Sequence, residues 1–377
     1  MIRDLTDDEA RAALPLKWEA AGVVPAWVAE MDFAQAEPIT EALVDAVRRG
    51  ALGYPPHSEE LGATFAGFAR RHWGWDVPAD ASVATGGVVG GMRLALEVLC
   101  PPGPVVVPVP CYPPFRDVVE VSGREIVPIE LDPDADDASL DLAAVSRAFA
   151  GGARTLLLCN PHNPLGYVPR REELAALAAL AHEYDARVVA DEIHGPLVLP
   201  PLDPAGPTFT PYLSVDERGI AVTSASKAFN MPATHGAQLV VLDPADRARL
   251  DVVPIPAQNT WSSLGVIASV VAWRDCDDWL AALVDRLASQ RSLLAELLDA
   301  RLPGARTRPL EATYLAWIDL RKYGVDDPAG AALAHGVRLA PGQDYQPGLA
   351  GHVRLNLATS PERLERIVGG LAAALAQ

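Results

Sequence analysis

Short apolar segments alternate with amphipathic segments through the middle of the chain. Six apolar segments are rich in Val, Ile and Leu without strict alternation of polar positions, which is typical of strands buried on both faces; they span residues 104–109, 125–130, 154–159, 187–190, 219–223 and 237–243. Residues 171–185 lie between the third and the fourth of these segments. Their apolar residues recur at helical spacing, and acidic residues occupy the first turn. The alternation predicts an α/β fold with a mostly parallel sheet covered on both faces.

The last third of the chain has a different pattern. Residues 279–302 predict one long amphipathic helix, and 313–320 and 352–358 predict strands with two unlike faces. A last helix is predicted over 360–376, with Ser360 as N-cap and Pro361 at its first position. We therefore expect a large α/β domain over residues 46–270. The remaining residues, 1–45 and 271–377, are expected to form a smaller α+β domain.

Composition and charge exclude several classes of partner. The chain has 377 residues, half of them hydrophobic, and a net charge of −18 from 31 basic and 49 acidic residues. Such a surface repels nucleic acid and anionic membranes. No apolar run approaches the roughly 18–20 residues of a membrane span, and the N-terminus lacks the pattern of a signal peptide. We expect a cytoplasmic protein that binds neither nucleic acid nor membrane.

Cysteine and histidine spacing gives no sign of a metal site. The four cysteines are scattered and form no CxxC pair, and the eight histidines form no HExxH. Such cysteines are typical of small buried residues in a reducing compartment. We therefore expect neither disulfides nor a bound metal.

Polar side chains follow three of the predicted strands. Asn163 lies in the loop after 154–159, Asp191 and His194 follow 187–190, and Ser224 and Lys227 follow 219–223. In open α/β sheets, ligands bind outside the carboxyl ends of the strands. An Asn, an Asp and a Lys converging there suit a ligand with a phenolic oxygen, a basic ring nitrogen and an aldehyde. Pyridoxal 5'-phosphate has all three groups.

Six motifs occur in the same order as in a known family of enzymes, and the resemblance covers nearly the whole chain. They are WVAEMDF (27–33), GALGYPP (50–56), NPHNPLGYVPRREEL (160–174), VVADEIHGPLVL (188–199), SASKAFNMP (224–232) and VRLNLATSPERLE (353–365). Together they resemble fold-type I pyridoxal-phosphate enzymes, which have the aspartate aminotransferase-like fold. More narrowly, the chain is similar to the cystathionine β-lyase and cysteine-S-conjugate β-lyase branch of the class I/II aminotransferases.

The resemblance implies a role for each polar residue at the strand ends. Lys227 matches the lysine that forms a Schiff base with the cofactor and later serves as general base. Asp191 matches the carboxylate that keeps the pyridine nitrogen protonated, and Asn163 matches the donor to the phenolic oxygen. His194 lies where related aminotransferases carry a Tyr that contacts the same oxygen, and Tyr112 matches the aromatic residue that stacks on the ring. Taken alone, each residue also fits a structural role: a surface lysine, a turn Asp or Asn, a buried His or Tyr.

Further matches concern the phosphate and the substrate. The Gly-rich turn at 84–96 runs into a predicted helix, so Gly87 and Val88 are expected to offer backbone N–H groups to the phosphate, with Ser224 adding a hydroxyl. Tyr54 matches a tyrosine that reaches the phosphate in the partner subunit's site, which implies a homodimer with shared active sites. Arg354 matches the residue that binds the substrate α-carboxylate. Without the resemblance, Tyr54 could be a buried loop residue and Arg354 a surface residue.

The sequence departs from the family pattern at three positions. Glu30 stands where the lyase branch usually has Asp, and Tyr167 stands where Arg is frequent. His235 stands near the expected phosphate site, where the branch usually has Lys and related aminotransferases have Arg. A neutral histidine would hold a phosphate dianion less strongly and would make its affinity depend more on pH. Asp32 and Phe33 are expected near the substrate entrance without a catalytic role.

Three functions are compatible with these residues. The first is a β-lyase that cleaves L-cystathionine or a related L-cysteine S-conjugate to a thiol, pyruvate and ammonia. The second is an aminotransferase that uses the same groups on an amino acid. The third is a regulatory protein on a transaminase fold, for which no DNA-binding extension is visible. The resemblance at both ends of the chain favours the lyase.

Overall fold

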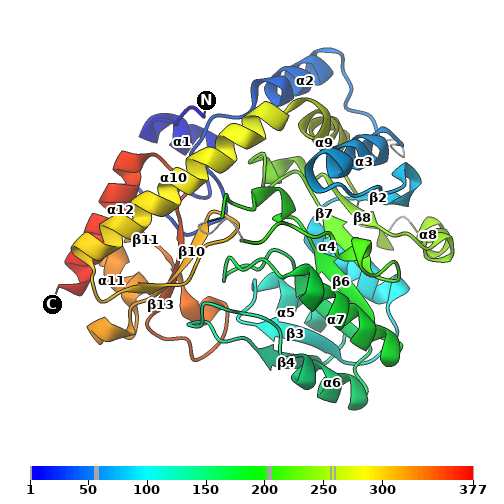
Figure 1. The fold of residues 1–377 in the computed structure, drawn as a ribbon. Helices are drawn as coiled ribbons and strands as arrows, with labels where there is room; N and C mark the ends of the chain where they lie inside the picture. The colour runs from blue at the N-terminus through cyan, green and yellow to red at the C-terminus, as the bar shows by residue number, and fades with distance from the viewer. Residues whose placement is uncertain (1, 55–58, 202–205, 255–256, 259, 377) are drawn as a thin grey trace.

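A seven-stranded sheet forms the centre of the larger part of the molecule (Figure 1). The computed structural model describes residues 2–54, 59–201, 206–254, 257–258 and 260–376. The strand order is β2-β8-β7-β6-β5-β3-β4. Pairs from β4 to β7 are parallel, whereas β8 runs antiparallel to both β7 and β2. The strands are β2 (Ser82–Thr85), β3 (Val105–Val109), β4 (Ile126–Glu130), β5 (Thr155–Cys159), β6 (Arg187–Asp191), β7 (Ile220–Thr223) and β8 (Ala237–Val240).

Helices cover both faces of this sheet because its central strands are apolar on both sides. In β5, Leu156 and Leu158 join one buried cluster while Leu157 and Cys159 join another. The surrounding helices are α2 (Glu37–Arg48), α3 (Glu59–Trp73), α4 (Val88–Leu94), α5 (Pro114–Val121), α6 (Leu142–Ala150), α7 (Arg171–Glu183), α8 (Pro244–Asp251) and α9 (Ser263–Asp275). Helix α4 continues as a wider π-helical turn over Ala95–Leu99.

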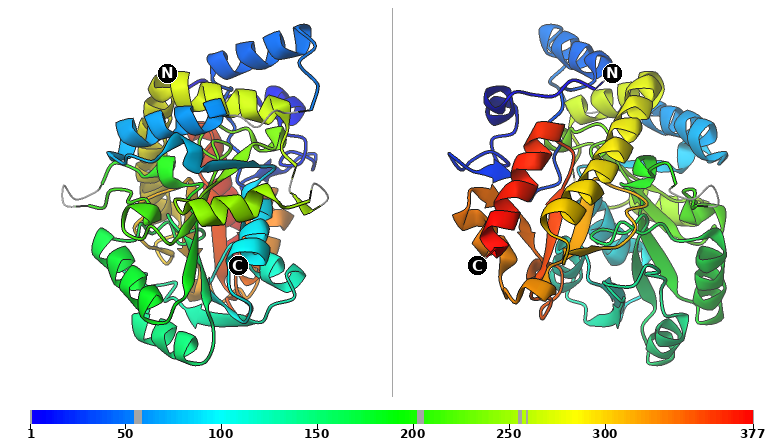
Figure 2. Two further views of the ribbon diagram at one scale, coloured as in Figure 1. Left: turned by 90° about the vertical axis from the view of Figure 1, so that its right-hand side faces the viewer. Right: turned by 60° about the vertical axis from the view of Figure 1, so that its left-hand side comes forward.

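A second sheet of four strands, in the order β12-β13-β10-β9, lies at the left of Figure 1. Its strands are β9 (Arg306–Thr307), β10 (Leu315–Asp319), β12 (Ala340–Pro341) and β13 (His352–Asn356). Helices α10 (Asp277–Arg301) and α12 (Pro361–Leu375) pack side by side there (Figure 2), and α11 (Pro328–Ala334) packs against α12. The N-terminal segment contributes α1 (Asp7–Ala13) and β1 (Val24–Pro25), which pairs with β11 (Val337–Arg338).

The predicted elements agree with the structure to within a few residues. The six apolar segments form β3 to β8, and the predicted parallel arrangement is confirmed for β3 to β7. The Ser360 side chain caps α12 by accepting a hydrogen bond from the Arg363 N–H, and Pro361 follows it, as predicted. Strand β8 ends at Val240, three residues before the predicted end at 243. The short strand β2 was not predicted.

Two further expectations concern the membrane and the cysteines. Among the described residues, no helix is both long enough and apolar enough to cross a membrane. Cys100, Cys111, Cys159 and Cys276 are buried with free thiols. Two prolines of the GALGYPP motif, Pro55 and Pro56, lie outside the described residues.

Candidate active site

Lys227 lies in the turn after β7 and is half-buried. Its Nζ donates a hydrogen bond to the Ala29 carbonyl at 2.8 Å. Burial lowers the pKa of Lys227 to about 8, and the nearby Arg354 guanidinium acts in the same direction, while Glu30 and Asp191 act against it. An amine with such a pKa is neutral in about a tenth of the molecules at pH 7. Lys227 is thus suited to act as a nucleophile or a base.

Asp191 ends β6 and is buried beside the same turn. Its Oδ1 accepts a hydrogen bond from the Ile193 N–H at 3.1 Å. Burial raises the pKa of Asp191 to about 7, although the Ile193 hydrogen bond and the charge of Lys227 lower it. A cationic N–H donor placed against this carboxyl group would restore its ionised form.

His194 follows in the same loop, and its Nδ1 is buried without a hydrogen-bond partner among the described residues. Burial lowers the pKa of His194 to about 3, and the charges of Lys227 and Arg354 lower it further. The imidazole is therefore neutral. Its ring packs edge-on against Tyr314, with 6.5 Å between the ring centroids.

Arg354 lies on β13 and brings a buried guanidinium to the ends of the large-sheet strands. Its Nη1 donates to Asn163 Oδ1 at 3.0 Å, and its Nη2 donates to the Trp27 carbonyl at 2.7 Å. Within the part of the chain that the structure describes, its Nε has no hydrogen-bond partner, and the guanidinium carbon lies 4.9 Å from the centroid of the Tyr345 ring. No carboxylate of the described residues pairs with this guanidinium. A buried cation held only by neutral acceptors is suited to bind an anionic ligand.

Two tyrosines border the same space. Tyr112 follows β3 and is half-buried; burial, together with the charge of Asp191, raises its pKa. Tyr314 lies just before β10, is fully buried and donates its hydroxyl to the Ala29 carbonyl at 3.1 Å. That carbonyl also accepts from Lys227, so the Tyr314 hydroxyl lies close to the lysine amine. The sequence prediction missed Tyr314, because its contact with Ala29 joins segments 285 residues apart.

The predicted phosphate residues lie around the start of α4. Gly87 is the N-cap of α4, Val88 is its first residue, and a Cβ added to Gly87 would meet no atom within 4 Å. This backbone therefore borders open space. The Ser224 hydroxyl donates to the Gly236 carbonyl at 2.6 Å, so it would have to rotate to serve another acceptor. His235 Nδ1 lies 3.3 Å from the Gly86 carbonyl, next to this turn.

Tyr54 has no contact with the rest of its own chain that would bury it. Its side chain is fully exposed, at 101% relative accessibility, so the alternative of a buried loop tyrosine is wrong. The neighbouring Gly53 carbonyl accepts a hydrogen bond from the Ser263 hydroxyl at 2.7 Å, which ties the loop to the start of α9. The structure therefore directs Tyr54 away from the chain that carries it.

Residues 27–31 form a segment that crosses the site and offers its carbonyl groups to polar side chains. Besides the Ala29 carbonyl, those of Val28 and Glu30 accept from Asn356 Nδ2 at 2.7 and 2.6 Å. Asp32 and Phe33, which follow this segment, are both buried rather than at an entrance. Asp32 is bound by Lys17 Nζ at 2.9 Å. These contacts fix the segment against both sheets.

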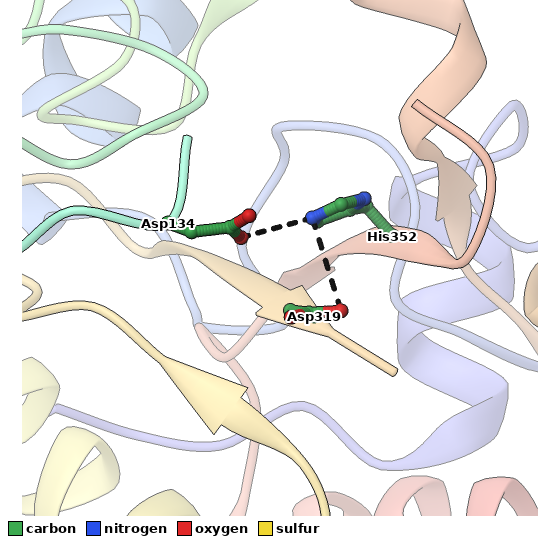
Figure 3. Close-up of side chains that lie close together, drawn as sticks. All are labelled: Asp134, Asp319 and His352. Carbon is green, nitrogen blue, oxygen red and sulfur yellow. Dashed lines mark hydrogen bonds and ion pairs between the residues drawn. The ribbon is translucent and has the colours of Figure 1, made fainter. Parts of the chain in front are cut away.

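Two carboxylates and a histidine, Asp134, Asp319 and His352, form a further cluster among the described residues (Figure 3). His352 Nε2 lies 3.1 Å from Asp134 Oδ1 and 3.9 Å from Asp319 Oδ1. Arg321 forms ion pairs with both carboxylates, at 2.5 Å to Asp134 and 2.9 Å to Asp319. Because Arg321 already pairs with both carboxylates, we interpret the cluster as a link between the loop after β4 and the smaller sheet.

Fold and site together define the class to which the protein belongs. Residues 28–371 match the model of the family "Aminotransferase class I and II", and the chain belongs to this family. Cystathionine beta-lyase of Corynebacterium glutamicum is 33% identical, with 98% of each chain covered. A structure described as a PLP-dependent β-cystathionase from Corynebacterium diphtheriae matches with a TM-score of 0.93 and 34% identity over all of both chains. The PLP-bound C-S lyase of Staphylococcus hominis matches with a TM-score of 0.89 and 25% identity over 100% of this chain and 97% of that chain. The expected aspartate aminotransferase-like fold and the family are thereby confirmed.

Proposed function

We propose that the protein is a pyridoxal-phosphate-dependent carbon–sulfur β-lyase that cleaves L-cystathionine or related L-cysteine S-conjugates. The products are a thiol, pyruvate and ammonia. The observation that carries the proposal is the presence in one site of Lys227, an amine with a pKa of about 8, and Arg354, a buried cation without a carboxylate partner among the described residues. The names of the similar proteins, which are β-lyases, support the choice of reaction.

The residues around Lys227 fit the proposed cofactor. The cofactor supplies an electron sink for the carbanion formed at the substrate Cα. Lys227 would bind its aldehyde carbon covalently, Asp191 its ring nitrogen and Asn163 its phenolic oxygen, with Tyr112 against the ring. The buried carboxyl of Asp191, whose pKa burial raises to about 7, is short of a cationic partner, and the ring N–H would provide one. The need of the Asp191 carboxyl group for a cationic partner supports the binding of this cofactor here.

The same fit extends to the phosphate group. The open space at the Gly87 backbone supports a phosphate at the start of α4, with Val88 and Ser224 as further donors and His235 beside them. We add Ser226 as a candidate donor, because it is half-buried between Ser224 and Lys227. His194, neutral and with Nδ1 unpartnered, is available for a hydrogen bond near the ring.

Arg354 is proposed to bind the α-carboxylate of the substrate. Its hydrogen bonds to Asn163 and Trp27 go to neutral oxygens, which a carboxylate can replace with shorter, charge-assisted bonds. The planar guanidinium can bind both carboxylate oxygens at once. This contact would fix the substrate Cα close to Lys227.

Lys227 is proposed to move the proton that starts the reaction. Once substrate has taken its place, the free amine removes the proton from the substrate Cα, for which a pKa of about 8 is suitable. The Cβ–S bond then breaks, its electron pair leaves with the sulfur, and the sulfur takes up a proton to become the thiol. The remaining aminoacrylate hydrolyses to pyruvate and ammonia.

We also propose a cytoplasmic homodimer with shared active sites. Full exposure of Tyr54 supports this arrangement, because a tyrosine that serves the phosphate of a partner subunit must leave its own chain. The division into a large domain over 46–270 and a small domain over the remaining residues belongs to the same proposal. The four buried free thiols agree with a reducing compartment.

Pyruvate release from L-cystathionine in the absence of any keto acid tests the proposed reaction. We expect many turnovers per active site, measured with a coupled lactate dehydrogenase assay. Stoichiometric conversion of the cofactor to its pyridoxamine form without pyruvate would show an aminotransferase instead. Binding of the cofactor without turnover of any amino acid would indicate a regulatory protein.

A further inference from the structure

A cavity of about 230 Å³ lies behind the loop that carries Asn163. Its walls come from α7, from the ends of β3 and β5, and from the loop 131–142 between β4 and α6. In Figure 1, β3, β4, α6 and α7 lie in the lower part of the molecule. None of the residues assigned above to cofactor or substrate lines this cavity. It is therefore separate from the candidate active site.

The walls of this cavity are mostly apolar. Six leucines from the loop after β4, from α6, from β5 and from α7 line it, together with Pro108 and Ala138; they are Leu131, Leu140, Leu142, Leu158, Leu174 and Leu177. Leu140 is partly exposed and Ser139 is exposed, so the cavity reaches the surface at this loop. An apolar cavity of about 150 Å³ holds a benzene molecule. The space here is thus sufficient for a single aromatic ring with a small substituent.

One polar side chain in the wall lacks a partner. His162 is 5% exposed, lines the cavity, and its Nδ1 has no hydrogen-bond partner among the described residues. Burial, together with the charge of Arg308, lowers the pKa of His162 to about 3, so the ring is neutral. A neutral imidazole nitrogen can donate or accept, depending on the tautomer, and a hydroxyl group can satisfy either.

Two other polar side chains of the wall, Tyr167 and Glu173, are paired with each other. The Tyr167 hydroxyl donates to both carboxylate oxygens of Glu173, at 2.7 and 2.8 Å. Tyr167 is also one of the departures from the family pattern, and its ring closes one side of the cavity. His162 is consequently a buried wall residue of the described part of the chain whose hydrogen-bonding capacity remains open to a ligand, whereas Ser139 lies at the exposed rim.

We propose that this cavity is a second binding site, which takes a single-ring aromatic ligand that bears a hydroxyl group. The ring fills the leucine-lined space, and the hydroxyl binds His162. The site adjoins the loop of Asn163, because Cys159 lines the cavity and its sulfur accepts from the Asn163 N–H at 3.4 Å. Backbone hydrogen bonds between His162 and residues 166 and 167 close the same loop. A ligand here would therefore restrain the loop that positions Asn163.

Phenol and toluene, titrated against the protein saturated with pyridoxal 5'-phosphate, test this proposal. Calorimetry gives the affinities, and hydrogen exchange measured by mass spectrometry shows where each probe binds. We expect phenol to bind about fivefold more tightly than toluene, the factor that corresponds to one net hydrogen bond of about 1 kcal/mol. Slower exchange is expected in segments 131–142 and 160–167.

Two variants separate the contributions of the hydroxyl and the ring. His162→Phe keeps an aromatic ring in the wall but removes the nitrogen, so the preference for phenol over toluene should disappear. Ala138→Leu fills part of the cavity and should weaken both probes at least about tenfold, whereas the matched control Ala138→Ser should not.

Three results would overturn the proposal. The first is the absence of saturable phenol binding up to about 10 mM, a weak limit on the affinity scale. The second is equal affinity of phenol and toluene for the unmodified protein. The third is protection from exchange only outside the two named segments. Should Ala138→Leu fail to fold, the ratio of the two affinities in His162→Phe still decides between a specific site and none.

Discussion

Replacement of Arg354 by lysine tests the proposed recognition of the substrate carboxylate. Lysine keeps the positive charge but cannot bind both carboxylate oxygens in the planar geometry of a guanidinium. In the structure, two separate N–H groups of Arg354 bind Asn163 and the Trp27 carbonyl, at 3.0 and 2.7 Å. We expect the substrate carboxylate to use both groups, so Arg354→Lys loses one charge-assisted hydrogen bond. Such a bond contributes about 1.5–3 kcal/mol, which predicts a fall in kcat/KM of about 10- to 150-fold.

The assay is pyruvate release from L-cystathionine, run beside an analogue that lacks the α-carboxylate and is followed by thiol release. The analogue should react slowly with the unmodified protein and change little in Arg354→Lys, because it has no group for Arg354 to bind. Arg338→Lys provides a matched control, since Arg338 pairs with Glu19 at the surface edge of β11. That variant should keep kcat/KM within about twofold.

Two outcomes would refute the reasoning about Arg354. One is a fall in kcat/KM for L-cystathionine of less than about threefold, which is below the effect of one charge-assisted hydrogen bond. The other is an equal fall for the carboxylate-free analogue, which would mean that the substitution disturbs the site in general. Absorbance spectra of the bound cofactor distinguish that second case from loss of cofactor.

Three further predictions concern single side chains. Lys227→Ala should abolish both pyruvate release and the near-visible absorbance band of covalently bound cofactor; a persisting band would contradict the role of Lys227. His235→Lys adds a permanent cation beside the Gly86 carbonyl and should tighten cofactor binding about fivefold or more, most clearly at high pH; an unchanged Kd in absorbance titrations would contradict this. Burial raises the pKa of Glu192 from 4.5 to about 8, so its protonated form stabilises the cofactor-free chain at low pH and this stability is lost as pH rises towards 8. Urea unfolding of Glu192→Gln should therefore show a smaller decline in stability between pH 5 and 8, and an undiminished decline would exclude Glu192 as its source.

The ends of the strands are the part of the site that the sequence predicts best. Asp191 follows an apolar run directly and Lys227 follows another within four residues, and parallel strands deliver their carboxyl ends to one edge, so their proximity follows from periodicity and topology. The opposing charges of the two side chains affect each other's pKa, which agrees with that proximity. Strand β2 could not be predicted in the same way. It has only four residues, Ser82–Thr85, and three of its four positions are partly exposed, so it lacks a continuous apolar signal.

Contacts between distant segments could not be predicted from local patterns. Tyr314 and Lys227 share the Ala29 carbonyl although about 285 and 198 residues separate them from it. Nothing in the local sequence of 27–31 marks its carbonyl groups as acceptors, because every residue has one. The burial of Asp32 could not be predicted for the same reason. Its partner Lys17 lies on another turn of the N-terminal segment, and the pair is buried rather than placed at an entrance.

The 27–31 segment explains how one small region can couple the cofactor to the substrate. Its carbonyl groups accept hydrogen bonds from the amine of Lys227 and from Nη2 of Arg354. These are the groups proposed to bind the cofactor and the substrate carboxylate. Each ligand must therefore displace a bond to this segment, and the bonds from Asn356 are what keep the segment in place meanwhile. Because hydrogen bonds of the polypeptide are exchanged for bonds to ligand, the groups stay satisfied when the site is empty and need little reorganisation when it fills. The residues proposed to bind the cofactor and the substrate thus lie on two different sheets, and the segment 27–31, which belongs to neither sheet, contacts both sets.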